Sequence, residues 1–177
     1  MSSAETQELD FWSYIALAKR RLGEEFGFGH PQATELLMTL NRASSVVTYD
    51  LESVIHRPRG RSWAAFRLML TIWIVGPAEP RRVAALSGMT RAAVSNLVKM
   101  LVGEGVVHRS RGDSDGRSAL LSLTVAGEQE MREVFAEHNQ REAAWAAALT
   151  EVEQQLLLML LNKLIAGSHD FGARGKS

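Results

Sequence analysis

Apolar residues recur at helical spacing along much of the chain, and the longest stripe follows Pro31. Its members lie three or four residues apart and keep one helix face apolar: Leu36, Leu40, Ala43, Val47, Leu51 and Val54. This stripe predicts a helix from Pro31 to about His56. An earlier amphipathic stretch predicts another helix from about Thr6 to Leu22, which stops at Gly23 before a glycine-rich loop.

The middle of the chain alternates short helical patterns with turn signals. Pro58 disfavours helix at the residue before it, and Ser62 is suited to cap a new helix over Trp63–Val75. Farther along, the short apolar runs at 106–109 and 119–123 flank a polar turn that contains glycine. Two such runs around such a turn predict a β-hairpin. The pattern therefore indicates a mainly α fold with one small hairpin.

Two further helices are predicted after the hairpin. Thr124 caps the first, which runs to about Leu149, and Thr150 opens a capping box for the second, which ends at Gly167. The last helix carries leucines on more than one face, among them Leu156, Leu157, Leu160, Leu161 and Leu164. One small central lobe is too little to cover them, so burial of this surface favours a homodimer. The alternative is a monomer in which the terminal helices pack on one another.

Composition excludes several classes of protein. The 177 residues are 46% hydrophobic and 23% charged, which is typical of a globular chain, and they include no cysteine. Disulfide scaffolds, thiolate metal sites and cysteine redox sensors are therefore excluded. The sequence shows neither a signal peptide nor a run of about 20 apolar residues. We expect a cytoplasmic, nucleoid-associated protein without a cofactor.

The formal net charge of zero hides a pattern along the chain. The segments 57–79 and 80–120 carry +3 and +4, whereas 1–56 and 121–170 carry −4 and −5. Attraction to DNA depends on the local potential of one face rather than on the total charge. The basic centre thus favours a nucleic-acid partner, although a random scatter of charges could produce the same sums.

The basic centre contains a candidate helix-turn-helix. In this motif the first helix needs a small residue where the second crosses it, and Ala84 is such a residue. The turn needs a residue that tolerates positive φ, which Gly88 supplies four residues later. Thr90 would cap the second helix, whose residues Val94, Leu97 and Leu101 are expected to face inward.

The opposite face of this second helix carries side chains that suit the major groove of DNA. They are Arg91, Ala92, Ser95, Asn96 and Lys99. Asparagine can bridge an adenine edge, arginine a guanine edge, serine either, and alanine can meet a thymine methyl group. The alternative is a merely solvated polar face, which is the commoner fate of such residues.

The predicted hairpin would form a wing beside this helix. Arg109, Arg111 and Arg117 lie near its tip, where arginines can enter a minor groove or hold phosphates. Asp115 cannot attract DNA, so we expect it to orient a neighbouring guanidinium through paired hydrogen bonds.

Three motifs in sequence resemble the MarR family of bacterial transcription regulators. They are the run Gly103–Arg109, the Asp115-Gly116-Arg117 wing and the Leu123–Gly127 entry to a long helix. The resemblance implies a dimeric winged helix-turn-helix protein on pseudo-palindromic duplex DNA, usually a repressor relieved by a small ligand. It also implies that Arg91, Ser95, Asn96 and Lys99 face the groove and that Arg117 pairs with Asp115. The predicted helix over 6–22 extends beyond the common family core.

The resemblance also divides the chain by expected role. Residues 1–56 and 125–167 would form the dimerisation helices around a winged helix-turn-helix lobe at 57–124. Residues 168–177 would form a flexible tail.

A ligand site is a weaker inference from the residues themselves. Aromatic and polar side chains near the lobe boundary would suit an aromatic acid: His56, Trp63, Phe66, Arg67 and Trp73. Plain core packing is the alternative for each of them, and a regulator without a ligand is the alternative for the protein as a whole. We expect no metal, although His56 and His138 could meet in space. An enzyme on the same scaffold is the least favoured reading.

Overall fold

The computed structural model of the chain describes residues 9–111 and 119–168. Contacts divide the chain into two compact units, one up to Tyr49 and one from Asp50 onward. The division falls inside a long helix, and each unit is described by itself. No helix among the described residues is long and apolar enough to span a membrane.

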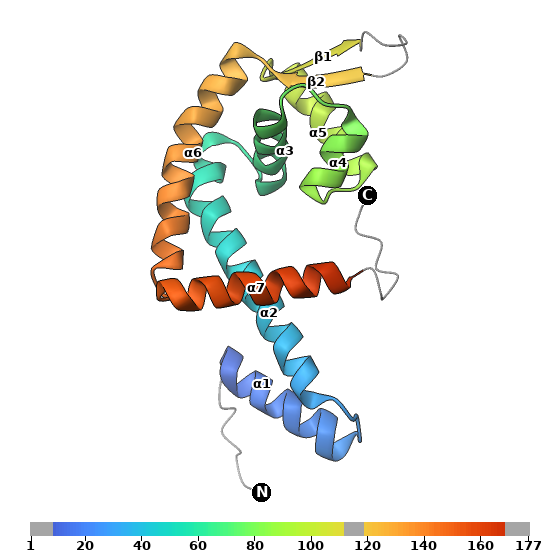
Figure 1. Ribbon diagram of the computed structural model, residues 1–177, viewed down its shortest axis with the longest axis vertical. Coiled ribbons are helices and arrows are strands. Elements are labelled where there is room, and N and C mark those ends of the chain that lie inside the picture. The colour runs from blue at the N-terminus through green and yellow to red at the C-terminus, as the bar shows by residue number, and fades with distance from the viewer. Residues whose placement is uncertain (1–8, 112–118, 169–177) are drawn as a thin grey trace, which may run out of the picture. The chain divides into compact units, whose positions relative to one another are not determined.

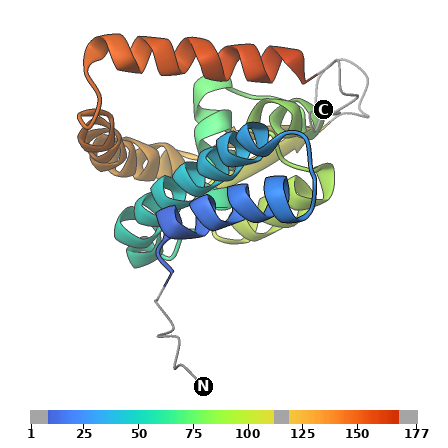
Figure 2. The ribbon, with the colours of Figure 1, turned by 90° about the horizontal axis from the view of Figure 1, so that it is seen from below.

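The first unit is a helical hairpin. Helix α1 (Phe11–Arg20) begins where Asp10 accepts a hydrogen bond of 2.7 Å from the backbone N–H of Ser13. It packs along the first half of α2 (Pro31–Leu51), with Lys19 and Glu35 2.7 Å apart (Figure 2). The predicted helix does not stop at Gly23, because a π-helical turn, η1 (Arg21–Glu25), continues it.

Helix α2 ends in two turns of irregular helix. A π-helical turn, η2 (Glu52–His56), and a 3₁₀ turn, η3 (Arg57–Arg59), follow Leu51. Gly60 then adopts a left-handed conformation with φ 70°, which glycine reaches without steric cost. The sequence predicted the end of this helix near His56 but not its change of hydrogen-bond pattern.

In the second unit, three short helices pack together with a two-stranded sheet, and two longer helices follow them. Helix α3 (Trp63–Val75) starts at its predicted cap, Ser62, and supplies the centre of the core with Phe66, Leu68, Met69 and Ile72. Helices α4 (Pro80–Ser87) and α5 (Arg91–Gly103) pack on α3 (Figure 1). Strands β1 (Val107–Arg111) and β2 (Ala119–Leu123) pair antiparallel, with Val107 opposite Leu123.

One backbone pairing adds to the predicted hairpin. Ala78 exchanges two backbone hydrogen bonds with Leu121, of 3.0 and 2.9 Å. The segment between α3 and α4 thereby joins the sheet at the edge formed by β2. A single bridge of this kind produces no alternation of apolar and polar residues, so the sequence pattern does not predict it.

Helix α6 (Val125–Ala146) begins at the predicted cap, Thr124, whose hydroxyl accepts a hydrogen bond from the Gly127 N–H. Helix α7 (Glu151–Gly167) carries the predicted capping box between Thr150 and Glu153. It follows α6 after a tight turn (Figures 1 and 2). Seven large apolar side chains of α7 are between 44% and 68% exposed: Leu156, Leu157, Leu158, Met159, Leu160, Leu164 and Ile165. A helix that is apolar around most of its circumference is ordinarily covered.

A cluster of polar side chains connects the last turn of α2 to α6 through hydrogen bonds. The carboxylate of Asp50 accepts two hydrogen bonds of 2.7 Å from the guanidinium of Arg141. It accepts a third, of 2.8 Å, from the indole N–H of Trp145. The Arg141 hydrogen bond, followed by that from Trp145, lowers the pKa of Asp50 from 3.8 to about 2.

This pKa shift predicts an acid dependence of stability. Because folding lowers the pKa, the ionised carboxylate stabilises the native state above a pH of about 4, and this contribution is lost as the pH falls towards 2. We expect Asp50→Asn to lower the thermal unfolding midpoint at neutral pH. The difference in unfolding midpoint between this variant and the unsubstituted protein should narrow steadily as the pH falls from about 4 towards 2. A difference in unfolding midpoint that does not change with pH would show that the Asp50 charge contributes nothing to stability.

Candidate nucleic-acid interface

The helix-turn-helix has the predicted geometry. Ala84 is buried at the crossing of α4 and α5, and its carbonyl accepts a hydrogen bond from the N–H of Gly88, which has φ 66°. Met89 fills the space beneath the turn and donates a 3.1 Å backbone hydrogen bond to the same carbonyl. Thr90 caps α5 through the backbone N–H of Ala93, at 3.2 Å. The turn thus fixes the direction in which α5 leaves α4.

The buried stripe of α5 differs from the prediction at one position. Val94, Val98 and Leu101 are buried, whereas Leu97 is half-buried. Spacings of four and three residues continue the stripe directly from Val94, so Val98 takes the central position of the buried face. Leu97 therefore lies at the edge of the packed face rather than at its centre.

All five predicted groove-facing residues are exposed on the side of α5 away from the core. They are Arg91, Ala92, Ser95, Asn96 and Lys99. A cavity of about 420 Å³ opens beside them, and Arg109 of β1 contributes to its wall. The strand therefore brings one predicted wing arginine to the face of α5.

The walls of this cavity are positively charged. Arg91, Lys99 and Arg109 line it, and no acidic residue does so among the described residues. Glu104, which follows α5, forms an ion pair with Arg61. A concave face with one sign of charge concentrates anions. This is the electrostatic arrangement that a DNA backbone requires.

The remaining predicted wing residues are only partly covered by the structure. Arg111 is the last residue of β1. Asp115 and Arg117 lie outside the described residues. Their pairing stays a prediction.

Arg67, a predicted ligand residue, contacts the helix-turn-helix. Its guanidinium donates a hydrogen bond to the carbonyl oxygen of Ser87, the last residue of α4. A cation at the carboxyl end of a helix satisfies an unpaired carbonyl and opposes the negative end of the helix dipole. Arg67 thus connects α3 to the turn that precedes α5. No local sequence pattern indicates this contact, because the two residues lie 20 positions apart.

Three other predicted ligand residues belong to an aromatic cluster. The His56 ring stacks on Phe66 with ring centroids 4.1 Å apart, and Trp63 lies 5.7 Å from Phe66. Helix α6 adds His138, whose ring centroid is 4.5 Å from that of Phe66 and 5.2 Å from that of His56. Trp73 lies farther along, 5.8 Å from Phe135.

The two buried histidines of this cluster are unusually short of hydrogen bonds. Within the described part of the chain, neither ring nitrogen of His56 has a hydrogen-bond partner, nor does Nδ1 of His138, while Nε2 of His138 lies 3.0 Å from a Glu142 oxygen. Burial, followed by the charges of His138 and Arg59, lowers the pKa of His56 to about 4. His56 is therefore neutral near pH 7.

Sequence analysis singled out His138 only as a remote metal candidate. It lies on the buried stripe of α6 with Gly127, Met131 and Val134, at spacings of four, three and four residues. That periodicity could have placed it in the core. The structure does bring His56 and His138 together, but no group of three or more metal-ligating side chains forms within 9–111 and 119–168.

The described geometry is that of a winged helix-turn-helix, and comparison with known proteins agrees. Residues 62–119 match the MarR family. The chain is 29% identical over 138 residues to an uncharacterized HTH-type transcriptional regulator, YwaE, of Bacillus subtilis (strain 168). The match covers 78% of this chain and 81% of that protein.

Two solved structures show the same fold at lower identity. One is a mutant MarR of E. coli complexed with operator DNA, with 19% identity and a TM-score of 0.67, covering 76% of this chain and 96% of that one. The other is BpsR of Bordetella bronchiseptica, whose DNA binding is regulated by 6-hydroxynicotinic acid, with 19% identity and a TM-score of 0.67. It covers 73% of this chain and 98% of that one. The chain is therefore similar to transcriptional regulators of the MarR family, and the family match itself covers residues 62–119.

Proposed function

We propose that the protein is a homodimeric repressor that binds a pseudo-palindromic operator and is released by a small aromatic acid. The observation that carries the DNA-binding part is the exposed face of α5, where Arg91, Asn96 and Lys99 border a cavity that Arg109 also lines. These side chains combine hydrogen bonding to base edges with attraction to phosphates. We place this activity in the cytoplasm, on the nucleoid.

Individual roles follow from the position of each side chain on this face. Asn96 is our candidate for an adenine edge, and Arg91 and Ser95 are candidates for guanine or for either base. Ala92 offers a methyl group that can meet a thymine. Thr90 and Lys99, at the start and the middle of the helix, are placed to hold phosphates. The wing residues Arg109, Arg111 and Arg117, with Asp115, would hold the flanking backbone or minor groove.

The uncovered apolar surface of α7 supports a homodimer. We assign dimerisation to residues 1–56 and 125–167 and DNA binding to 57–124, with 168–177 as a tail. A continuous group of exposed large apolar side chains on one helix marks an interaction surface. A two-fold dimer would present two copies of α5, and a two-fold operator matches that symmetry.

The aromatic cluster supports a ligand-responsive regulator. An acid bound against His56, Trp63 and Phe66 would supply a hydrogen-bond partner that His56 does not find among the described residues. Arg67 and Trp73 complete the candidate set. Since His56 and Phe66 are buried and stacked, a ligand would have to separate the rings, and this movement would pass to α3.

A titration distinguishes a ligand-responsive protein from a regulator without a ligand. Aromatic acids, beginning with 6-hydroxynicotinic acid, are added while tryptophan fluorescence and DNA binding are followed. Quenching accompanied by weaker DNA binding supports the ligand site. Fluorescence and binding that stay constant across the panel would leave a regulator that only competes for promoters.

Selection of bound fragments from genomic DNA by the purified protein tests the DNA-binding function. The proposal requires an enriched inverted repeat with half-sites about one helical turn apart. Enrichment of no sequence, with only weak and salt-sensitive binding, would contradict it.

Asn96→Ala tests base reading on the selected fragment. Loss of a bidentate contact should weaken operator binding by about 1–3 kcal/mol and relax the preference at one base pair of each half-site. Binding to unrelated DNA should change little, because Asn96 carries no charge. The measurement is the affinity for the operator, for operators changed at single positions and for unrelated DNA. An equal loss on all of them would make Asn96 a backbone contact.

A further inference from the structure

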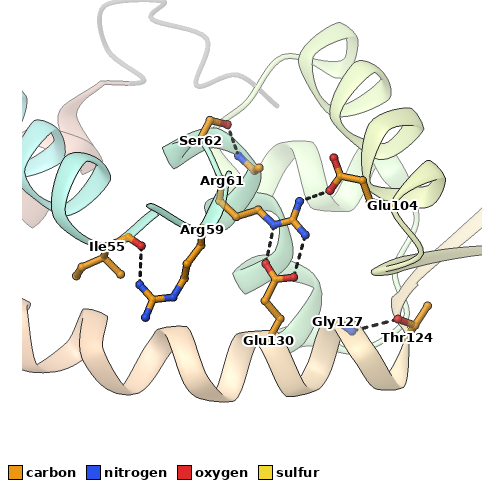
Figure 3. A network of polar contacts seen from close by, with 9 residues as sticks. Ile55, Arg59, Arg61, Ser62, Glu104, Thr124, Gly127 and Glu130 are labelled. Atoms are coloured by element: carbon orange, nitrogen blue, oxygen red, sulfur yellow. Dashed lines mark hydrogen bonds and ion pairs between the residues drawn. The ribbon is translucent and has the colours of Figure 1, made fainter. Parts of the chain in front are cut away.

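Arg61 joins three separate elements of the second unit. It precedes Ser62, the cap of α3, and its side chain is only 12% exposed. Its Nε and Nη2 donate hydrogen bonds of 2.6 and 2.8 Å to the two carboxylate oxygens of Glu130 on α6. Its Nη1 contacts the carboxylate of Glu104 (Figure 3). One guanidinium thus holds two acids from different parts of the chain.

Glu104 connects this guanidinium to the helix that we assign to the major groove. It is the C-cap of α5, and its backbone N–H donates a 3.0 Å hydrogen bond to Met100 within the last turn. Movement of Glu104 therefore moves the end of α5. The carboxylate lies at the opposite end of α5 from its cap, Thr90, so it can set the tilt of the helix without touching DNA.

Direct packing between α5 and α6 is limited. Helix α5 packs mainly on α3, α4 and β1, whereas α6 packs mainly on α3, η2 and β2. The ion pairs of Arg61 therefore connect the end of α5 to α6, two helices that share few direct packing contacts. A bidentate arginine is suited to this task because its planar fork holds a carboxylate in one orientation. The Glu130 hydrogen bonds raise the pKa of Arg61 above its usual value, so the clamp stays charged.

Arg59 provides a matched comparison in the same loop. It donates a hydrogen bond of 2.8 Å to the carbonyl of Ile55 and one of 2.6 Å to Glu137, which lies on α6 seven residues after Glu130. Both arginines thus bind the loop to α6. Figure 3 shows the contact of Arg59 with Ile55 and that of Arg61 with Glu130. Of the two, Arg61 is the one that also contacts the end of α5.

We propose that Arg61 is a positioning residue for DNA recognition, which clamps α5 to α6 and so sets the spacing between half-sites that the dimer accepts. The inference rests on the proposed function. Helix α6 leads into α7, our candidate dimer helix, so the angle between α5 and α6 fixes how far apart the two copies of α5 lie. One added base pair moves a half-site by about 3.4 Å and rotates it by about 34°. A small change in the angle between α5 and α6 should therefore change the half-site spacing that the dimer prefers.

Affinity for a set of operators tests the clamp. The selected operator is compared with versions whose half-sites are one base pair closer or farther apart, and with unrelated DNA. The variants are Arg61→Gln, Glu104→Gln and the control Arg59→Gln, all studied as full chains well below their unfolding temperatures. Arg61→Gln should weaken binding to the selected operator by about tenfold and lower its preference over the altered spacings by about fivefold. Glu104→Gln should change the preference in the same direction.

The control and the unrelated DNA separate positioning from a general loss of structure. Arg59→Gln should keep the spacing preference of the unsubstituted protein even if it unfolds at a lower temperature. Affinity for unrelated DNA should be unchanged in all variants, because the phosphate contacts are intact. An Arg61→Gln protein with an unaltered spacing preference would overturn the inference. If the unsubstituted protein itself showed no operator preference, the proposed function would fail instead.

Discussion

Gly127→Ala is expected to destabilise the fold by about 3 kcal/mol or more, because the added methyl group has no space. A Cβ at this position would overlap the carbonyl oxygen of Val106 and lie 3.0 Å from its carbonyl carbon. Both obstacles are backbone atoms and cannot rotate away. The same oxygen accepts the 3.1 Å hydrogen bond from the Thr124 N–H, and Thr124 caps α6 through Gly127. Relief of the clash would therefore also break the start of α6.

Gly103→Ala is the matched control for this substitution. Gly103 is the last residue of α5, and a Cβ there meets no atom within 4 Å. Alanine at such a position should leave stability unchanged or raise it by up to about 1 kcal/mol. Chemical denaturation of both variants measures the difference. A Gly127→Ala protein as stable as the control would show that α6 does not need this close approach to the backbone of Val106.

Leu160→Asp should convert the proposed dimer into monomers and weaken operator binding by about 100-fold or more. Leu160 is 47% exposed in the single chain, so aspartate should leave the fold of each chain intact. In a dimer interface, however, the same side chain would be a buried and unpaired charge. Each chain would then bind its half-site independently, and the affinity gained when one dimer binds both half-sites would be lost.

Gln155→Asp introduces the same charge on the same helix as a control. Gln155 is exposed and lies on the polar side of α7, between Glu151 and Asn162 on the helix surface. Sedimentation velocity gives the oligomeric state of both variants, and titration of the operator gives their affinity. A Leu160→Asp protein that remains dimeric and binds as tightly as the control would place the dimer interface elsewhere.

Features set by neighbouring residues could be predicted from the sequence. The caps Ser62, Thr90, Thr124 and Thr150 act within three residues of themselves, and each begins the helix expected of it. The helix-turn-helix follows the same rule, since the needs of its turn are met within five residues of Ala84. The exposed face of α5 then follows from the position of its buried stripe.

Features that depend on distant residues could not be predicted in this way. Arg61 lies 69 positions from Glu130 and 43 from Glu104, and in the sequence it is one more cation in a basic turn. Arg67 likewise lies 20 positions from Ser87, whose carbonyl accepts its hydrogen bond, and no local pattern indicates that contact. The π-helical turns were missed as well, because the apolar stripe of α2 continues through Val54 regardless of the hydrogen-bond pattern.

The class of protein was decided by motifs and their order together. No single motif separates a winged helix that reads DNA from one that serves an enzyme. The run from Gly103 to Gly127, with the basic face of α5 before it, favoured the regulator. The family match over residues 62–119 agrees with that choice.

Methylation interference on the selected operator tests the central claim most directly. Dimethyl sulfate methylates N7 of guanine in the major groove and N3 of adenine in the minor groove. If α5 reads the major groove in a dimer, methylated guanines should block binding in two clusters whose centres lie about 10 base pairs apart. Interference by methylated adenines alone, or no interference at any guanine, would contradict the assignment of α5 to the major groove.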